Sequence, residues 1–235
     1  DSDTLPLLQG KKNLLAFSGG VDSTALFFLL NREEIPFDLA IVNYNTRENS
    51  SLEAKYGQEL AERFCKKCFL LSTEPPKKNF EAKAREIRYR FFEQIIRDNG
   101  YENLITAHQL NDRLEWFLMR LSKGAGLKEM LSGGNVTKKN GYRVVKPLFN
   151  CEKQRLYDYL QKNKIKYFED ESNADCKYER NLIRNSFSNK FLELFSNGVK
   201  KSFEILEEEV SAFTADTFEK DSLIVFKSSN EIVIF

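Results

Sequence analysis

The sequence predicts an α/β fold whose sheet is doubly wound and mainly parallel. Short apolar segments, such as residues 14–17, alternate with segments whose apolar residues recur at helical spacing. This alternation is typical of parallel β-α units with helices on both faces of the sheet. The 235 residues, 41% of them hydrophobic, are enough to bury one large core with some length to spare. We therefore expect one main domain and a C-terminal helical extension.

The predicted elements of the main domain follow in order along the chain. Short apolar runs predict strands at residues 14–17, 37–45, 68–72 and 103–107. Helical spacing predicts helices at residues 22–32, 50–67, 79–100 and 109–122. In the first helix Ala25 and Leu29 lie four apart, and in the third Asn79 is a candidate cap and Gly100 a stop signal.

The remainder of the chain is less regular. We expect a surface loop at 123–142, a helix at 151–164, a polar segment at 165–181, two helices from about 180 to 218, and two strands at the end. The expected domains are a catalytic domain at 1–188, a helical linker at 189–222 and a strand pair at 223–235 that begins a further domain. The chain does not begin with Met and ends abruptly, which leaves open that it is a fragment.

Composition excludes several classes of protein. Lys+Arg number 36 and Asp+Glu 35, so no overall charge points to nucleic acid or membrane, and RNA contacts must come from local patches. The four cysteines show no paired CxxC zinc pattern and are too few for a disulfide scaffold, which favours a reducing cytoplasm. No apolar run reaches the roughly 20 residues of a membrane span, so we expect no membrane partner.

The stretch Ser-Gly-Gly-Val-Asp-Ser, residues 18–23, joins the first strand to the first helix. Backbone N–H groups and the positive end of the helix dipole favour a phosphate at such a turn, and glycines let the ligand approach closely. An acid beside a phosphate makes sense if Mg²⁺ lies between them, which assigns Asp22 to a metal. The alternative is an ordinary turn in which Asp22 or Ser23 caps its own helix.

These residues resemble known motifs. Ser-Gly-Gly-x-Asp-Ser is similar to the signature of the N-type ATP pyrophosphatases, and it lacks the lysine of a GxxxxGK[ST] loop. Further collinear segments resemble the tRNA(Ile)-lysidine synthetase family, and together they span about residues 12–190. They are 47–54 (RENSSLEA), 79–89, 106–115 (TAHQLNDRLE), 124–127, 146–148 (KPL) and 169–184.

The resemblance implies an adenine nucleotide alpha hydrolase-like fold and a cytoplasmic, ATP- and Mg²⁺-dependent ligase. ATP would adenylate the C2 oxygen of the wobble cytidine in a CAU-anticodon tRNA(Ile), releasing pyrophosphate. Free L-lysine would then attack C2 through its amine and expel AMP, leaving lysidine. Oligomeric state and the rejection of tRNA(Met) stay open.

The resemblance also implies a set of site residues. Ser18, Gly19, Gly20, Val21, Asp22 and Ser23 would bind the nucleotide. His108 and Arg85 would contact its phosphates, Asp112 would lie near Mg²⁺ or the lysine, and Glu115 near the incoming ammonium. The alternative for the last two is a solvated helix face paired with Arg113 and Arg120.

Four cationic or amide groups are assigned to RNA. Arg88 shares a helix face with Arg85, whereas Lys83 and Arg90 are expected to be solvated. Arg180, Asn181 and Arg184 would contact tRNA phosphate or the flipped cytidine. The alternative for the segment that contains them is a cluster of caps and salt bridges that ties a loop to a helix.

The sequence departs from the family pattern at two places. An acid and a histidine of the family are replaced by Asn43 and Tyr44, and Gln109 and Asn111 interrupt a His-His-x-Asp-Asp-Gln motif. Two other functions stay open. One is a tRNA 2-thiocytidine synthase, which would need redox-active cysteines such as the CxxC at 65–68, here expected to be incidental. The other is a non-catalytic regulator that binds ATP.

Overall fold

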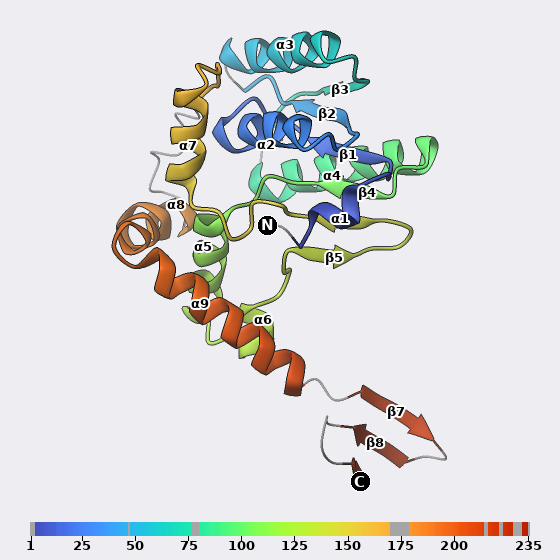
Figure 1. Ribbon diagram of the computed structural model, residues 1–235, viewed down its shortest axis with the longest axis vertical. Helices are drawn as coiled ribbons and strands as arrows, with labels where there is room; N and C mark the ends of the chain where they lie inside the picture. Colours follow the sequence, from blue (N-terminus) through green and yellow to red (C-terminus); the bar gives the residue numbers. More distant parts are fainter. Residues whose placement is uncertain are drawn as a thin grey trace. The chain divides into compact units, whose positions relative to one another are not determined.

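The computed structural model divides into two compact units (Figure 1). It describes residues 3–46, 48–76, 80–169, 179–213, 216–220, 223–227 and 232–234. The first unit comprises Asp1–Arg113 and Gly133–Cys176, and the second Leu114–Ser132 and Lys177–Phe235. Arg47, Asn79 and residues 170–178, which carry part of the predicted motifs, lie outside the described residues.

A mainly parallel sheet of six strands forms the centre of the first unit, which confirms the predicted class. Its strand order is β3-β2-β1-β4-β6-β5, and only β5 runs antiparallel to its neighbour. Leu15 of β1 pairs with Leu39 on one side and Ile105 on the other. The strands are β1 (Asn13–Ala16), β2 (Asp38–Asn43), β3 (Cys68–Ser72), β4 (Asn103–Ile105), β5 (Val136–Lys138) and β6 (Arg143–Val145).

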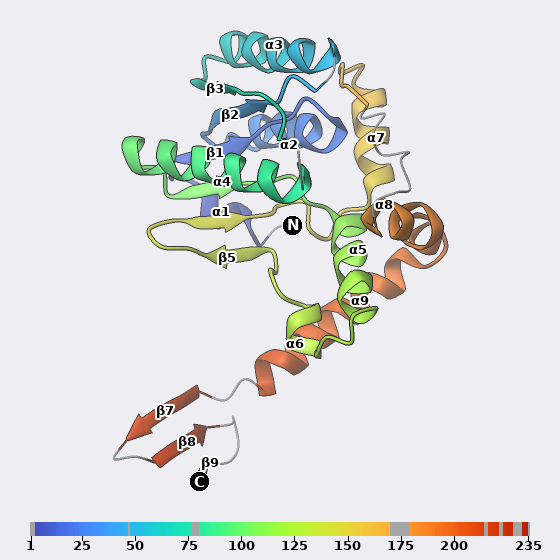
Figure 2. The same cartoon turned by 180° about the vertical axis from the view of Figure 1, so that it is seen from behind.

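Helices cover both faces of this sheet, as Figures 1 and 2 show from opposite sides. Leu15 faces the core formed with α2, α3 and α7, whereas its neighbour Leu14 faces the core formed with α4. Successive side chains of a strand point to opposite faces, so a buried strand contributes side chains to both cores. These helices and the first one are α1 (Leu5–Leu8), α2 (Val21–Arg32), α3 (Glu48–Arg63), α4 (Phe80–Asn99) and α7 (Lys153–Lys162).

Buried amides close the amino end of the sheet. The Asn13 side chain donates to the carbonyls of Leu8 at 2.9 Å and Pro36 at 2.7 Å, and Asn103 donates to Asn13 Oδ1 at 2.8 Å. Each satisfied buried amide contributes to stability, and none is left to bind a ligand. The carboxyl end of the parallel strands is therefore where ligand chemistry belongs.

The prediction of a plain loop at 123–142 was wrong in part. This stretch contains α6 (Leu127–Met130) and the edge strand β5, which pairs antiparallel with β6. A turn at Gly141, with φ of 84°, joins β5 to β6. Elements of three or four residues are too short to produce a hydrophobic period, so pairing with β6 defines the strand.

The second unit is helical and ends in strands. It holds α5 from Leu114 onward, α6, α8 and α9 with a π-helical turn between the last two, and a three-stranded antiparallel sheet. The last helix ends at Phe213, and β7 begins at Asp216. The expectation of helix up to about residue 218 was therefore wrong. The bounds are α5 (Leu110–Leu121), α8 (Glu179–Ile183), the π turn η2 (Arg184–Ser188), α9 (Asn189–Phe213), β7 (Asp216–Lys220), β8 (Leu223–Lys227) and β9 (Ile232–Ile234).

Within the described residues, none of the helices combines the length and apolar character needed to cross a bilayer.

Gly57 sets how closely α3 approaches the sheet. A Cβ at this position would overlap the Ile41 side chain and lie 3.0 Å from the ring of Phe17. Both neighbours are buried, with Ile41 on β2 and Phe17 directly after β1. The absence of a side chain at Gly57 therefore lets α3 pack directly against β2 and against Phe17, which leads from β1 into the 18–23 turn.

We expect Gly57→Ala to lower the free energy of unfolding by about 1–2 kcal/mol, since overpacking outweighs the gain in helix propensity. Gly198→Ala on α9 is the matched control. No atom lies within 4 Å of a Cβ there, so it should raise stability by about 0.5–1 kcal/mol. Urea unfolding followed by circular dichroism measures both, and equal effects of one sign would contradict the close approach.

Candidate functional site

The turn after β1 has the backbone geometry that its glycines allow. Gly19 has φ of +79°, and a Cβ there would lie 3.3 Å from Cβ of Glu53 on α3. Gly20, with φ of −72° and ψ of 170°, is the extended N-cap of α2 and has no side-chain capping bond. The alternative in which Asp22 or Ser23 caps this helix is therefore wrong. The amino end of a twelve-residue helix instead points at the turn.

Side chains of the turn hold its shape. Ser23 Oγ accepts a hydrogen bond from the Ser18 N–H at 3.2 Å, contacts Ser18 Oγ at 3.1 Å, and donates to the Gly20 carbonyl at 3.2 Å. Thr24 Oγ1 donates to the Gly19 carbonyl at 3.1 Å. The N–H of Phe168 donates to the same carbonyl at 3.0 Å. The turn is thus preorganised, which reduces the cost of ordering it around an anion.

Asp22 lies half-buried in the first turn of α2. Burial, followed by the charges of Glu169 and Asp22, raises the pKa of Tyr157, so both carboxylates lie close enough to act on one phenol. Mg²⁺ takes one or two carboxylates together with substrate phosphates, and the carboxylate of Asp22, in the first turn of α2, is a ligand of that kind. The described residues contain no cluster of three His, Cys, Asp or Glu side chains that would hold a metal without a substrate.

His108 follows the neighbouring strand. Because β1 and β4 are paired in parallel, the 18–23 turn and His108 emerge at the same edge of the sheet. The Thr106 hydroxyl lies 2.9 Å from His108 Nδ1 and fixes the ring. The structure thus places the 18–23 turn and His108, two of the three groups that the resemblance assigns to the nucleotide, at one edge of the sheet.

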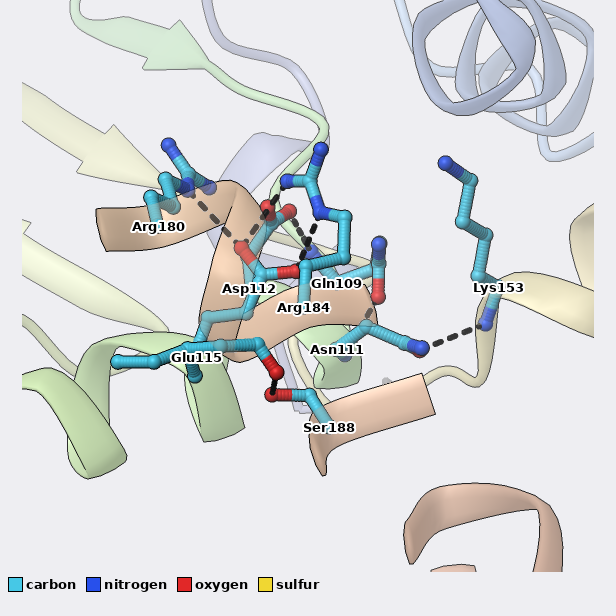
Figure 3. Close-up of polar contacts among 9 residues, drawn as sticks. Gln109, Asn111, Asp112, Glu115, Lys153, Arg180, Arg184 and Ser188 are labelled. Atoms are coloured by element: carbon cyan, nitrogen blue, oxygen red, sulfur yellow. Dashed lines mark hydrogen bonds and ion pairs between the residues drawn. The ribbon is translucent and has the colours of Figure 1, made fainter. Parts of the chain in front are cut away.

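The start of α5 explains two departures from the family motif. Gln109 Oε1 accepts a hydrogen bond from the Asn111 N–H at 2.5 Å, and Asp112 Oδ2 accepts one from the Gln109 N–H at 3.1 Å (Figure 3). The bond to Asp112 is one half of a capping box, and the Gln109 side chain caps the next free N–H, that of Asn111. Asn111 Oδ1 in turn accepts from the Lys153 N–H at 3.3 Å, at the start of α7. Gln109 and Asn111 are therefore structural, and Asp112 caps the helix with one of its oxygens.

Asn43 and Tyr44, the other departures, also make structural bonds. Asn43 Oδ1 accepts from the Asn45 N–H at 2.9 Å. The Tyr44 hydroxyl donates to the Ala84 carbonyl at 2.5 Å and so ties the end of β2 to α4. Burial raises the pKa of Tyr44, and the positive charge of Arg88 opposes this effect. Arg88 is exposed on α4, close to the carboxyl edge.

Lys146 was not among the predicted site residues. It directly follows β6, and its ammonium donates to the carbonyl of Gly133 and, at 2.8 Å, to that of Gly134. Burial first, and then the charges of Arg85 and Arg113, lower the pKa of Lys146 to about 8. The only signal in the sequence was its place after a strand, in the segment KPL.

A buried carboxylate lies in the second unit (Figure 3). Glu115, 1% exposed, accepts from Arg184 through Nε at 2.6 Å and Nη2 at 3.0 Å, and from Arg180 through Nε at 2.9 Å. The expected alternative, a solvated face paired with Arg113 and Arg120, is wrong for Glu115. The ion pairs of Arg180 and Arg184 match the alternative in which this segment forms a cluster of salt bridges. Asn181, which follows Arg180 in the chain, is buried.

The CxxC cysteines lie away from this edge. Cys68 begins β3, at the amino end of a parallel strand, and Cys65 precedes it in the turn. Burial raises the pKa of the Cys68 thiol to about 11. Thiolates are the metal-binding and nucleophilic form, so the position of the pair and the raised pKa of Cys68 both disfavour redox or cluster chemistry.

Comparison with known proteins identifies related sequences. A family profile described as PP-loop domain matches residues 3–191. Proteins named tRNA(Ile)-lysidine synthase are similar to this chain. The Campylobacter jejuni protein is 49% identical over 207 residues, covering 88% of this chain and 64% of that protein. The Wolinella succinogenes protein is 48% identical over 224 residues, covering 94% of this chain and 68% of that protein. The Helicobacter pylori protein is 47% identical over 204 residues, covering 87% of this chain and 60% of that protein. The chain thus spans about two thirds of the length of these relatives.

A solved structure shares the fold. The U34-tRNA thiolase NcsA from Methanococcus maripaludis, described with its 4Fe-4S cluster, superposes with a TM-score of 0.71. The match covers 89% of this chain and 74% of that one at 19% sequence identity. At this identity the likeness concerns the fold alone.

We expect Arg184→Met to cost about 3–4 kcal/mol of unfolding free energy, since it leaves a buried carboxylate without its bidentate partner. Arg180→Met should cost about 1 kcal/mol, because that side chain is 39% exposed against 16% for Arg184. Arg120→Met, which removes an ion pair with the exposed Glu129, is the control and should cost less than about 1 kcal/mol. Urea unfolding measures all three. Equal losses for Arg180→Met and Arg184→Met would refute the proposed asymmetry.

Lys146 should make stability depend on pH. The unfolded lysine keeps its proton up to its ordinary pKa of 10.5, whereas the folded side chain loses it near 8. Because the unfolded state binds more protons between these values, the free energy of unfolding should rise with pH there. Urea titrations from about pH 8 to 9.5 should show a weaker rise in Lys146→Met than in the wild type, whereas Lys83→Met, on the exposed face of α4, should keep the wild-type slope.

Proposed function

The chain belongs to the tRNA(Ile)-lysidine synthase family of PP-loop proteins, and we propose that it ligates lysine to C2 of the wobble cytidine in a CAU-anticodon tRNA(Ile), at the expense of ATP. The observation that carries this proposal is the preorganised turn at 18–23, which presents the amino end of α2 and the exposed Ser18 side chain to an anion. The shared edge with His108 supports it further.

In the first step the C2 oxygen of cytidine forms a bond to the α-phosphorus of ATP. The bond from that phosphorus to the oxygen bridging to the β-phosphate breaks, and pyrophosphate leaves. Ser18 to Ser23 would hold the departing diphosphate through backbone N–H groups and the helix dipole. His108, fixed by Thr106, and Arg85 would neutralise negative charge that builds up on the phosphates.

Mg²⁺ fits Asp22, with substrate oxygens completing its coordination. When bound, it supplies charge neutralisation at the phosphates. Asp112 remains a proposed second contact, although one of its oxygens caps α5. A carboxylate can accept several hydrogen bonds, so the cap does not exhaust this side chain.

In the second step the lysine amine attacks C2, the bond from C2 to the adenylated oxygen breaks, AMP leaves and the amine loses a proton. The oxygen departs with AMP, which is a better leaving group than the carbonyl oxygen alone. We assign the incoming ammonium to Glu115. Since both of its oxygens bind arginine, the exposed Arg180 is the partner that would exchange, and Arg184 the one that stays.

Of the four residues that the resemblance assigns to RNA, Arg88, Arg180, Asn181 and Arg184, we retain Arg88 and Arg180. Arg88 is exposed and free to reach a phosphate, whereas Arg184 is largely buried and suits an internal role better. The 2-thiocytidine alternative is less well supported, because Cys65 and Cys68 lie at the amino end of β3. A regulator that binds ATP without turnover stays a second candidate.

The test is incubation of the chain with labelled lysine, ATP and an unmodified CAU-anticodon transcript. Label on the RNA that depends on the wobble cytidine is the expected result. AMP formation without label, or ATP binding without AMP, would overturn the proposal.

Asp22→Ala should abolish RNA-dependent exchange of pyrophosphate into ATP, because it removes the carboxylate proposed to neutralise the phosphates through a cation. Circular dichroism should show an intact fold, since the side chain caps no helix. Lys162→Ala, at the end of α7 and exposed, is the control and should exchange normally. Undiminished exchange by Asp22→Ala would rule out this role.

A further inference from the structure

Tyr56 of α3 contacts residues on both sides of the 18–23 turn. The centroid of its ring lies 6.3 Å from that of Phe17, which leads into the turn, and 5.7 Å from that of Phe168. Its hydroxyl donates to the Lys166 carbonyl at 2.5 Å, across 110 positions of the chain. Burial raises the pKa of Tyr56 to about 12, so the phenol keeps its proton and stays a donor. This side chain thus ties a distant segment to the residue that leads into the turn.

Residues 166–168 pair with the turn. Phe168 and Gly20 form a parallel β-bridge, and the Phe168 N–H donates to the Gly19 carbonyl at 3.0 Å. The Thr24 hydroxyl donates to the same carbonyl at 3.1 Å. Two donors from different parts of the chain therefore fix the direction of this one carbonyl.

The direction of the Gly19 carbonyl determines where the next N–H points. A trans peptide is planar, so its carbonyl and its N–H point in opposite directions, and among the described residues no peptide bond is cis. The Gly20 N–H therefore points away from the N–H of Phe168, and it donates to Ser18 Oγ at 3.4 Å. This bond is longer than the usual range for N–H donors. A phosphate oxygen would make a shorter, charge-assisted bond to the same N–H.

Two adjacent glycines make this peptide easy to rotate. Gly19 and Gly20 lack the Cβ atoms that restrict the backbone of other residues, so the peptide plane between them can turn over at little steric cost. A turned peptide would present the Gly19 carbonyl to the ligand in place of the Gly20 N–H. Because a carbonyl oxygen repels a phosphate, the turn depends on bonds from outside that hold one orientation.

We propose that Tyr56 is a positioning residue for the nucleotide. It holds residues 166–168, whose bond to the Gly19 carbonyl keeps the Gly20 N–H directed at a phosphate. This inference rests on the proposed function, since it takes the 18–23 turn as the nucleotide site. It adds α3 to that site through the backbone alone, with no contact between Tyr56 and the substrate.

Calorimetric binding of a non-hydrolysable ATP analogue to the full chain, without RNA, tests the proposal. Tyr56→Phe keeps the ring and removes the hydroxyl, and it should weaken binding about threefold to tenfold, the range for one lost hydrogen bond. Thr24 still holds the carbonyl, so binding should not be abolished. In RNA-dependent exchange of pyrophosphate into ATP, KM for ATP should rise by the same factor with kcat unchanged, because bound phosphate restores the orientation.

Tyr101→Phe is the matched control. Its hydroxyl donates to Asp38 at 2.6 Å, at the amino end of β2 and so at the opposite edge of the sheet. The variant loses a hydroxyl bond of similar length and should bind the analogue as the wild type does. Lys166→Met keeps the backbone carbonyl that Tyr56 binds, so its affinity should also be unchanged. Thermal melting monitors the fold of each variant.

Two further measurements address the bond itself. Phe168→Pro removes the N–H donor. It should weaken analogue binding by a similar factor and add little to the loss in Tyr56→Phe, because both changes act on one bond. Hydrogen exchange gives a readout that needs no nucleotide. In Tyr56→Phe the Phe168 amide should exchange about threefold to tenfold faster than in the wild type.

The contrary outcomes are distinguishable. If Tyr56→Phe binds the analogue as the wild type does, this inference is overturned and the proposed function stands. Equal losses in Tyr56→Phe and Tyr101→Phe would show a general loss of stability, and a loss in Lys166→Met would show that its ammonium acts on the nucleotide. Either result overturns the inference. If the wild type binds no ATP analogue, the proposed function fails together with this inference.

Discussion

The left-handed backbone at Gly19 is the constraint on which the site depends. With φ of +79° and Glu53 of α3 directly behind it, this residue turns β1 into α2 within a few positions. Glycine adopts this conformation without steric cost, and a Cβ here would lie in tight contact with Cβ of Glu53, at 3.3 Å. Thr24 and Phe168 both bind the Gly19 carbonyl, so α2 and a distant segment hold the same atom. The amino end of α2 is thereby aimed at the carboxyl edge of the sheet.

The two ends of the sheet serve different purposes. At the amino end, Asn13 and Asn103 satisfy one another and nearby carbonyls. At the carboxyl end, polar groups are held in place by neighbours but face outward, as with His108 against Thr106. Gln109 caps α5, and Asn111 links α5 to α7. Hydrogen bonds from neighbouring elements thus hold these residues at the edge.

Sequence patterns predicted the parallel sheet and its principal helices because buried strands and amphipathic helices carry a period that local reading detects. They failed where a feature depends on distant residues. Strand β5 has three residues and exists through pairing with β6. The partners of Glu115 lie 65 and 69 positions away. The sequence did not single out Lys146, because its partner Gly133 and the charges of Arg85 and Arg113 come from other segments of the chain. The 18–23 turn was predictable because its determinants are contiguous.

The π turn at Arg184–Ser188 makes the second unit sensitive to chain length. A π turn contains one more residue than an α turn, and removing that residue would rotate α9 by about 100° relative to α8. Phe195, whose backbone is not helical (φ of −132°, ψ of 20°), divides α9 into two parts. Substitutions in the π turn leave the phase of α8 and the first part of α9 intact. A single-residue deletion would instead rotate that first part, as far as Phe195.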